Sequence, residues 1–165
     1  MSEKIIFSAE FEKYNSADEL LETDRQLLNT ARSCAKDAYA PYSEFHVGAA
    51  LMLENGLVVQ GNNQENASYT LGLCAERVAL FAAGANHPGK KIVAMAITAY
   101  SDHFNIDRAI APCGACRQAI AEYEQRYQQP IKLIMSGSSG NVLIATSISP
   151  LLPLQFSKED LKPKL

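Results

Sequence analysis

Three cysteines and one glutamate are the residues of this chain best suited to chemistry. Cys74 and Glu76 lie two residues apart, and Cys113 and Cys116 follow as a Cys-x-x-Cys pair. Three thiolates suit Zn²⁺, and a site with only three protein ligands leaves a fourth position open for water. A carboxylate beside such a site can move protons on and off that water. The spacing therefore predicts an open, catalytic zinc site with Glu76 as its proton carrier.

Other interpretations of these cysteines stay open at the level of the sequence. A Cys-x-x-Cys pair also occurs in redox proteins, and as half of a structural zinc site with four ligands. His46, His87 and His103 stand outside any ligand spacing, and Cys34 falls on an apolar stripe where a buried thiol is expected. Three ligands without an obvious fourth favour the catalytic site. A non-catalytic, structural zinc module is the alternative from a different class.

Three thiolates more than neutralise Zn²⁺, which weakens its power to acidify water. Two features oppose this effect. Both cysteine motifs open a predicted helix, whose free N–H groups and dipole stabilise nearby negative charge. Arg77, one turn after Cys74, can donate hydrogen bonds to sulfur, although a solvated surface arginine is the alternative at this position. We expect the site to remain acidic enough for catalysis.

The composition is that of an ordinary globular domain of 165 residues, with 47% hydrophobic and 20% charged residues. A net charge of −3 offers no basic surface for nucleic acid. The sequence shows no apolar run as long as a membrane span and no signal-peptide core. Four cysteines in such a chain indicate a reducing compartment. We therefore predict a cytoplasmic protein without nucleic-acid or membrane partners.

The elements that must hold the cysteines are predicted from hydrophobic periodicity. Residues 4–14 place apolar side chains at every second position, which favours an edge strand or an arm toward a neighbouring subunit, with a partly ordered N-terminal extension as an equal alternative. A helix is predicted from Ser16 or Asp18 to about Tyr39, where Pro41 ends it. Residues 1–15 are accordingly treated as an N-terminal extension of a catalytic domain.

A hairpin follows this helix, because Asn55-Gly56 is a strong turn signal between two apolar strands. Gly48 within the first of these strands indicates the close approach of a packed helix. The predicted strands are 45–53, 57–61, 91–99, 131–135 and 142–145, and the later helices are about 73–85 and 113–127. This order favours a three-layer α/β/α fold with a mixed, roughly five-stranded sheet. The single domain would span residues 16–165, ending in a mobile, lysine-rich tail.

Five segments of the chain carry a pattern that goes beyond periodicity. They are Tyr39 to Ala50, Gly61 to Tyr69, Cys74 to Arg77, Pro112 to Gln118 and Leu151 to Phe156. Cys-x-Glu followed by Pro-Cys-x-x-Cys is the zinc-deaminase signature in its three-cysteine form. From about Ala38 to Phe156 the chain resembles the small, homotetrameric type of cytidine deaminase. The resemblance implies a cytidine-deaminase-like fold and a homotetramer with one zinc per subunit.

The resemblance also implies a reaction. Cytidine and 2′-deoxycytidine would be hydrolysed to the uridines with release of ammonia, a step of pyrimidine salvage. Glu76 would take a proton from the attacking water, pass it to N3 of the ring, and later protonate the leaving amino group. The closest alternative is a deaminase of another aminopyrimidine nucleoside, such as blasticidin S. Nucleic-acid deaminases fit less well, since they usually place a histidine where Cys74 stands.

Further site residues follow from the resemblance alone. Cys74, Cys113 and Cys116 would hold the zinc, and these are the only thiols within the matched motifs. The substrate-binding residues are matched by position. Asn63 and Glu65 match residues that bind the ribose hydroxyls, and Phe45 matches an aromatic side chain that contacts the pyrimidine.

Two more positions concern the base and the neighbouring subunit. The backbone N–H of Ala75 is expected to hold the carbonyl of the base. Phe156 matches a residue that reaches the site of a neighbour, so that sites would be completed across subunits. Without the resemblance, Phe45 and Phe156 would pass as core aromatics, and Asn63 and Glu65 as residues of a surface loop.

Overall fold

The computed structural model describes residues 2–161, so residue 1 and residues 162–165 of the predicted lysine-rich tail lie outside the described residues. Its helices are α1 (Glu22–Ala35), α2 (Ala75–Asn86) and α3 (Gly114–Tyr127), and its strands are β1 (Glu12–Tyr14), β2 (Phe45–Leu53), β3 (Val58–Asn62), β4 (Ile92–Ser101), β5 (Lys132–Ser136) and β6 (Val142–Ala145). Short 3₁₀ helices cover Ala17–Glu19, Tyr69–Leu71, Ser149–Leu151 and Lys158–Leu161. Among the described residues, no helix is both long and apolar enough to cross a membrane.

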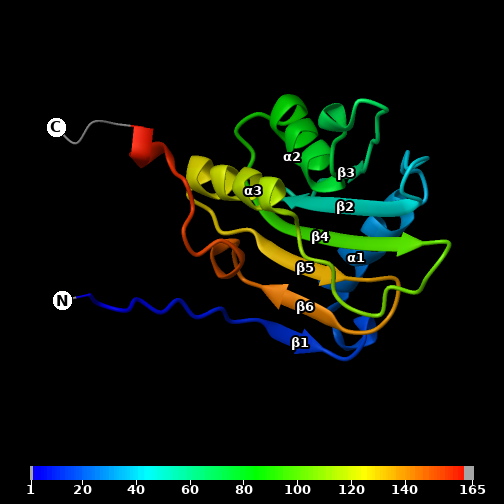
Figure 1. The fold of residues 1–165 in the computed structure, drawn as a ribbon, viewed down its shortest axis with the longest axis horizontal. Coiled ribbons are helices and arrows are strands. Elements are labelled where there is room, and N and C mark those ends of the chain that lie inside the picture. Colours follow the sequence, from blue (N-terminus) through cyan, green and yellow to red (C-terminus); the bar gives the residue numbers. More distant parts are fainter. Residues whose placement is uncertain (1, 162–165) are drawn as a thin grey trace.

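The strands form one mixed sheet in the order β1-β6-β5-β4-β2-β3 (Figure 1). Strands β4 and β5 are parallel, and the other neighbouring pairs are antiparallel. The predicted mixed sheet is confirmed, but within residues 2–161 it has six strands rather than about five. The additional strand is β1, which pairs with β6 at one edge.

The helices cover the sheet on both faces, α1 on one and α2 with α3 on the other (Figure 1). Successive residues of a strand point to opposite faces, and the core follows this alternation. Ala94 and Ala96 of β4 pack with the α1 side, whereas Met95 and Ile97 pack with the α2 and α3 side. The predicted three-layer α/β/α architecture is therefore the observed one.

Two glycines allow the helices to lie unusually close to the sheet. A Cβ atom at Gly48 would lie 2.0 Å from the backbone oxygen of Ala31 in α1. On the opposite face, a Cβ atom at Gly61 would lie 2.6 Å from the backbone oxygen of Ala75 in α2. The close helix approach predicted at Gly48 is confirmed. Gly61 has the same role for the helix that carries Glu76.

The N-terminal residues differ from the strand predicted over 4–14. Only Glu12–Tyr14 form a strand, with Glu12 opposite Ile144 of β6. The preceding residues follow an extended path along the edge of the molecule without regular structure (Figure 1). Ile5 and Ile6 are 77% and 88% exposed, so the alternation of residues 4–11 buries little apolar surface within this chain.

Helix α1 is shorter than predicted at both ends. Ser16 caps a 3₁₀ turn rather than the α-helix itself, because its hydroxyl accepts a hydrogen bond from the N–H of Asp18. The helix stops at Ala35, four residues before the predicted end. The backbone of Tyr39 is instead bonded to the loop after β3, donating to the oxygen of Asn63 and accepting from the N–H of Glu65.

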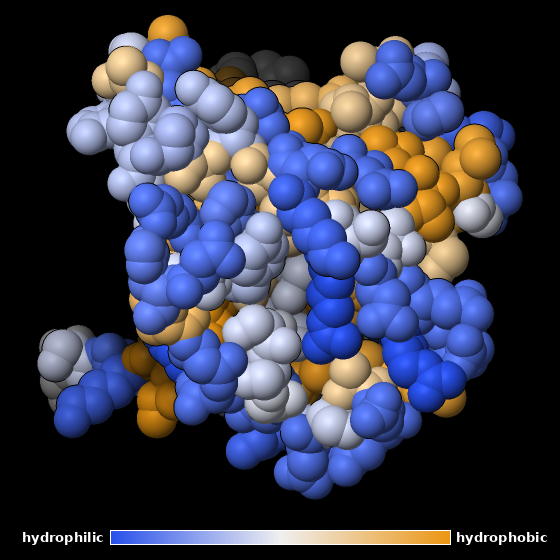
Figure 2. All heavy atoms as spheres, turned by 90° about the vertical axis from the view of Figure 1, so that its right-hand side faces the viewer, coloured by the Kyte–Doolittle hydropathy of each residue, from blue (hydrophilic) through white to orange (hydrophobic). Residues whose placement is uncertain are grey.

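The two cysteine motifs lie where the sequence predicts, at the starts of α2 and α3. Cys74 and Cys113 are the N-cap residues of these helices, and Cys116 lies one turn into α3. Seen from the end of the molecule at the right of Figure 1, the surface is largely hydrophilic, with hydrophobic residues gathered mainly at one upper corner (Figure 2). This end of the molecule is therefore mostly polar.

Candidate active site

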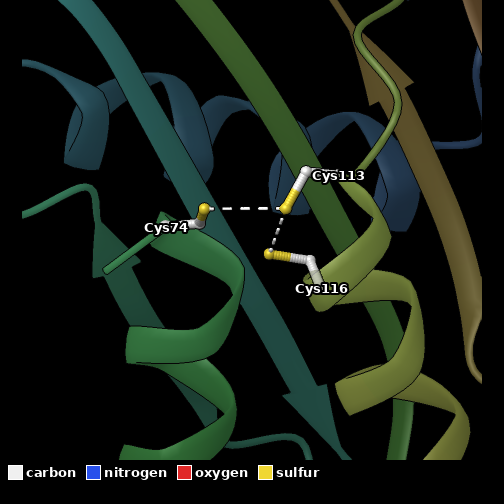
Figure 3. Close-up of side chains that lie close together, drawn as sticks. All are labelled: Cys74, Cys113 and Cys116. Carbon is white, nitrogen blue, oxygen red and sulfur yellow. Dashed lines mark hydrogen bonds between the residues drawn. The ribbon is translucent and has the colours of Figure 1, made fainter. Parts of the chain in front are cut away.

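Three thiols converge at the adjoining starts of α2 and α3. The Sγ atom of Cys113 lies 3.8 Å from that of Cys74 and 3.5 Å from that of Cys116. All three sulfur atoms lie within 4.8 Å of one another and point toward a common centre (Figure 3). Three convergent thiols with this separation fit a tetrahedral Zn²⁺ ion, which prefers sulfur and nitrogen ligands. The three cysteines from which the sequence predicts a metal site thus form a cluster able to hold a metal ion.

The electrostatics of the cluster favour a thiolate, which is the form that binds metal. A hydrogen bond from the Cys116 thiol, helped by Arg77, lowers the pKa of Cys74 to about 5 despite its partial burial. The same hydrogen bond, together with burial, raises the pKa of Cys116. Of Cys74 and Cys116, Cys74 is therefore the first to lose its proton.

Glu76 lies beside this cluster on the first turn of α2. Its side chain is only 4% exposed, and it lines the same cavity as Cys74 and Cys113. Burial raises the pKa of its carboxyl group, and the negative charge at Cys74 acts in the same direction. A carboxyl group whose pKa is shifted toward neutrality can both accept and return a proton, which a general acid–base catalyst must do.

Arg77 contacts the cluster from the same turn. Its Nη2 atom donates a hydrogen bond to the Sγ atom of Cys74 over 3.8 Å. This bond raises the pKa of the guanidinium group, since the thiolate favours its charged form. The contact with sulfur that the sequence raises as one of two interpretations is present, and the side chain is only partly exposed.

A cavity of about 620 Å³ opens in front of the thiols and Glu76. This volume lies within the usual range for a small-molecule site. Its lining combines polar groups with an apolar wall, made by Ser43, Phe45, Val47, Asn63, Gln64, Glu65, Tyr69, Gly72, Leu73, Cys74, Glu76, Arg77, Ile97, Ile110, Ala111 and Cys113. Seven of the residues singled out from the sequence therefore line one cavity, and two more, Ala75 and Cys116, adjoin it.

Asn63 lines this cavity and also braces strand β2. Its Oδ1 atom accepts a hydrogen bond of 2.7 Å from the N–H of Val47, and its Nδ2 atom donates one of 2.9 Å to the oxygen of Phe45. An amide side chain has two donor hydrogens and two acceptor lone pairs, so each end keeps one further bond to offer. Asn63 thus fixes the backbone around Phe45 while remaining able to bind a ligand.

Glu65 has a comparable position. Its carboxylate accepts hydrogen bonds from the N–H groups of Tyr42 and Ser43 and from the hydroxyl of Ser43. Burial alone would raise the pKa of this carboxyl group, but these hydrogen bonds lower it overall. Glu65 is therefore a fixed anion at the cavity wall, suited to accept hydrogen bonds from hydroxyl groups.

Of the remaining predicted residues, two lie at the cavity and one lies away from it. Phe45 lines the cavity, and Ala75 is buried at the first position of α2, where its N–H has no partner within the helix. Phe156 does not line the cavity of its own chain and is 57% exposed. Its backbone oxygen accepts a hydrogen bond of 2.8 Å from Nε2 of Gln118 in α3.

Several site residues were missed by the sequence reasoning. Ile97, Ile110 and Ala111 form part of the apolar wall, but nothing in their local pattern separates them from other core or loop residues. Arg117 donates 2.8 Å and 2.9 Å hydrogen bonds to the backbone oxygens of Pro112 and Leu151, which joins the cysteine loop to the C-terminal segment. The Pro112–Gln118 motif contains Arg117, but its partner lies 34 residues away.

The family of the chain follows from comparison with known proteins. A family model described as the "Cytidine and deoxycytidylate deaminase zinc-binding region" matches residues 21–128. The chain belongs to this family. Both cysteine motifs and Glu76 fall within the matched residues, so the family resemblance and the zinc-binding deaminase domain predicted from the sequence are confirmed.

Individual members of the family match most of the chain. The cytidine deaminase of Halalkalibacterium halodurans is 42% identical over 139 residues, covering 84% of this chain and 98% of that protein. The crystal structure of cytidine deaminase from Burkholderia pseudomallei superimposes with a TM-score of 0.70 and 39% identity, covering 83% of this chain and 100% of that one. A more distant relative, the blasticidin-S deaminase of Bacillus cereus, is 31% identical over 70% of this chain and 80% of that protein. The cytidine-deaminase-like fold is thereby confirmed.

Proposed function

We propose that this chain catalyses the zinc-dependent hydrolytic deamination of cytidine and 2′-deoxycytidine, giving the uridines and ammonia. The observation that carries the proposal is the buried Glu76 beside three convergent thiols, at a cavity also lined by Asn63 and Glu65. A structural zinc module would need neither a buried carboxylate at the metal nor a cavity of nucleoside size. The similarity to cytidine deaminases over most of the chain supports the same substrate.

In the proposed mechanism, Glu76 carries the protons. Zinc held by Cys74, Cys113 and Cys116 would supply a Lewis acid that lowers the pKa of water. Glu76 takes a proton from the attacking water and delivers it to N3 of the pyrimidine, which makes C4 more electrophilic. The hydroxide formed from the water adds to C4. Glu76 then takes the proton of the new C4 hydroxyl group and gives it to the amino group, so that the C4–N bond breaks as the C4 carbonyl forms and ammonia leaves. The raised pKa of its carboxyl group suits both transfers.

Other residues hold the nucleoside and tune the thiolates. Asn63 and Glu65 would bind the ribose hydroxyls, Phe45 would contact the pyrimidine, and the N–H of Ala75 would donate to the carbonyl of the base. Support comes from their positions around one cavity and from the free N–H at the start of α2. Arg77 would withdraw charge from the sulfur of Cys74 through its hydrogen bond.

The quaternary arrangement belongs to the same proposal. The enzyme would be a homotetramer with one zinc per subunit, in which Phe156 completes the cavity of a neighbour. This role is supported by the exposure of Phe156 and by its absence from the lining of its own cavity. Residues 16–165 would form the catalytic domain and residues 1–15 an N-terminal extension. The enzyme would act in pyrimidine salvage in the cytoplasm, where the four free cysteines would stay reduced.

Loss of the ultraviolet absorption band of cytidine on adding the protein tests this function directly. We expect both cytidine and 2′-deoxycytidine to be converted, and we expect a chelator to abolish the reaction and zinc to restore it. Protein that retains zinc but leaves the cytidine spectrum unchanged would contradict the proposed function.

A deaminase of blasticidin S is the second candidate, because a relative of that name covers 70% of this chain. The same spectroscopic assay with cytidine, 2′-deoxycytidine and blasticidin S separates the two. A higher kcat/KM for blasticidin S than for cytidine would favour this second candidate.

A further inference from the structure

The loop between β4 and α3 is attached to the turn between β5 and β6. The N–H of Ile106 donates to the hydroxyl of Ser138 over 3.0 Å, and its backbone oxygen accepts a 3.1 Å hydrogen bond from the N–H of Ser139. The N–H of Ala109 donates to Oδ1 of Asn141 over 3.1 Å, and the side chain of Ile106 is buried. The middle of this loop is therefore held firmly against the sheet.

The tip of the same loop contacts the start of β2. The ring of Phe104 stacks against that of Phe45, with 6.5 Å between their centroids and 27° between their planes. Next to this pair, the imidazole of His103 contacts the carboxylate of Glu44. Glu44 has a φ of +51°, in the left-handed region that non-glycine residues seldom adopt. The loop thus holds both Phe45 and the residue before it.

These contacts join the wall of the cavity through Phe45. Phe45 lines the cavity, and Ile110 and Ala111, further along the same loop, line it too. Phe104 is not among the lining residues, and its stacking partner Phe45 is one of them. Its side chain is 57% exposed, which means that its removal changes little in the core of the molecule.

We propose that Phe104 is a positioning residue, which orients the ring of Phe45 against the pyrimidine and so helps to set the affinity for substrate. The inference rests on the proposed function, in which Phe45 contacts the base. Asn63 fixes the backbone between the carbonyl of Phe45 and the N–H of Val47, but these hydrogen bonds do not involve the ring itself. Among the described residues, Phe104 is the aromatic side chain that stacks on this ring.

Replacement of Phe104 by alanine should raise the KM for cytidine roughly two- to tenfold. This range follows from the interaction free energy of an aromatic pair. The kcat should stay near the wild-type value, because Glu76 and the thiols are untouched. The conservative variant Phe104→Tyr should restore the KM, since a tyrosine ring can stack in the same way. Phe7→Ala is the matched control, because Phe7 is similarly exposed (52%) and does not line this cavity.

A second measurement separates this inference from the proposed function. In protein labelled on phenylalanine rings, the Phe45 resonances, assigned with Phe45→Leu, should shift in Phe104→Ala and not in Phe7→Ala. A wild-type protein that does not deaminate cytidine would refute the proposed function, and unshifted Phe45 resonances would then still overturn the positioning role. Unchanged KM in Phe104→Ala would overturn it as well. A raised KM with unshifted Phe45 resonances would also do so, because Phe104 would then contact the substrate itself.

Discussion

Glu76 and Cys74 lie two residues apart, yet their surroundings shift their pKa values in opposite directions. Burial raises the pKa of the Glu76 carboxyl group, whereas hydrogen bonds from Cys116 and Arg77 lower that of the Cys74 thiol. The result is a thiolate that can bind metal beside a carboxyl group that can exchange a proton. Two groups whose pKa values are driven apart in this way are typical of a site that needs both an acid and a base.

Replacement of Glu76 by glutamine tests its role in proton transfer. Glutamine has nearly the same shape but cannot carry the proton, so kcat for cytidine should fall at least about 10²–10⁴-fold. The zinc content and the KM should change little, because the thiols are intact. Steady-state kinetics and metal analysis measure these quantities. Glu122→Gln, an exposed glutamate on α3, serves as control, and near-normal turnover of Glu76→Gln would exclude the proposed mechanism.

For single residues, the sequence predicts the chemically active side chains better than it predicts the groups that contact them. Cys74, Glu76 and the Cys-x-x-Cys pair are recognisable because their spacing along the chain is itself the signal. The partners of Glu65 cannot be recognised in this way, because its carboxylate binds Tyr42 and Ser43, which lie 22 or more residues earlier in the chain. The stacking of Phe104 on Phe45 likewise depends on a loop conformation that no local pattern encodes.

Among the elements, the positions of α1 and α2 on the sheet each depend on a glycine. Gly48 and the next residue, Ala49, point to opposite faces of β2, and β3 presents Gly61 to α2. The predicted β-hairpin and the strands β4, β5 and β6 are confirmed to within two residues at each end, because their apolar runs are continuous. The end of α1 was predicted wrongly, since the bonds from Tyr39 to the loop after β3 are tertiary contacts.

Gly48→Ala should destabilise the protein by about 3 kcal/mol, because the new methyl group meets backbone atoms of α1 that cannot rotate away. For a domain of this size, the melting temperature should fall by roughly 6–12 °C. Differential scanning calorimetry of the zinc-loaded protein measures the shift. The matched control is Gly114→Ala, where an added Cβ atom has no neighbour within 4 Å, and equal melting temperatures for the two variants would contradict this account.

Glu124 of α3 joins three elements and makes stability depend on pH. Its Oε1 atom accepts hydrogen bonds of 2.8 Å from the N–H of Ile131, before β5, and of 3.0 Å from that of Ile148, after β6. Burial raises the pKa of its carboxyl group above the ordinary value of 4.5. The folded state therefore holds the proton more tightly than the unfolded chain. The resulting stabilisation is complete below the unfolded-state pKa and is lost as pH rises through the folded-state pKa.

Glu124→Gln should remove this pH dependence, since glutamine keeps the acceptor oxygen but does not titrate. The free energy of unfolding of the wild type, minus that of the variant, should decrease as the pH rises from about 4 to about 8. Chemical denaturation at several pH values measures the difference. Because the cysteines titrate equally in both proteins, their contribution cancels. A difference that is constant or that increases with pH would show that burial does not dominate at Glu124.

At the scale of the whole molecule, the C-terminal segment bears on the proposal that a neighbouring chain completes the cavity. Phe156 is held near α3 by Gln118 and lies outside the cavity of its own chain. Arg117 of α3 also binds the backbone oxygen of Leu151, which fixes the start of the C-terminal segment next to α3. The sequence could predict a role for Phe156 only through family resemblance, because a contact with a second chain leaves no local pattern.

Mixing two impaired variants tests the proposed sharing of sites. Phe156→Ala should lower kcat/KM for cytidine, and wild-type protein should sediment at four times the 18.0 kDa chain mass. When Phe156→Ala chains are dissociated and reassembled with Glu76→Gln chains, activity should rise, because intact Glu76 sites then receive Phe156 from a neighbour. Wild-type chains reassembled in the same way are the control. An active monomer, or mixed chains that gain no activity, would exclude sites completed across subunits.

The position of β4 in the chain, between the two cysteine motifs, also bears on the order of folding. Cys74 precedes β4 in the chain and Cys113 follows it, and β4 itself lies between β2 and β5 in the sheet. The two helix starts can therefore meet only after a central strand has paired with partners distant in sequence, and such pairings form slowly. Refolding chains should thus acquire zinc late, after the sheet has assembled. Metal uptake during synthesis would then mark molecules that have already reached the native topology.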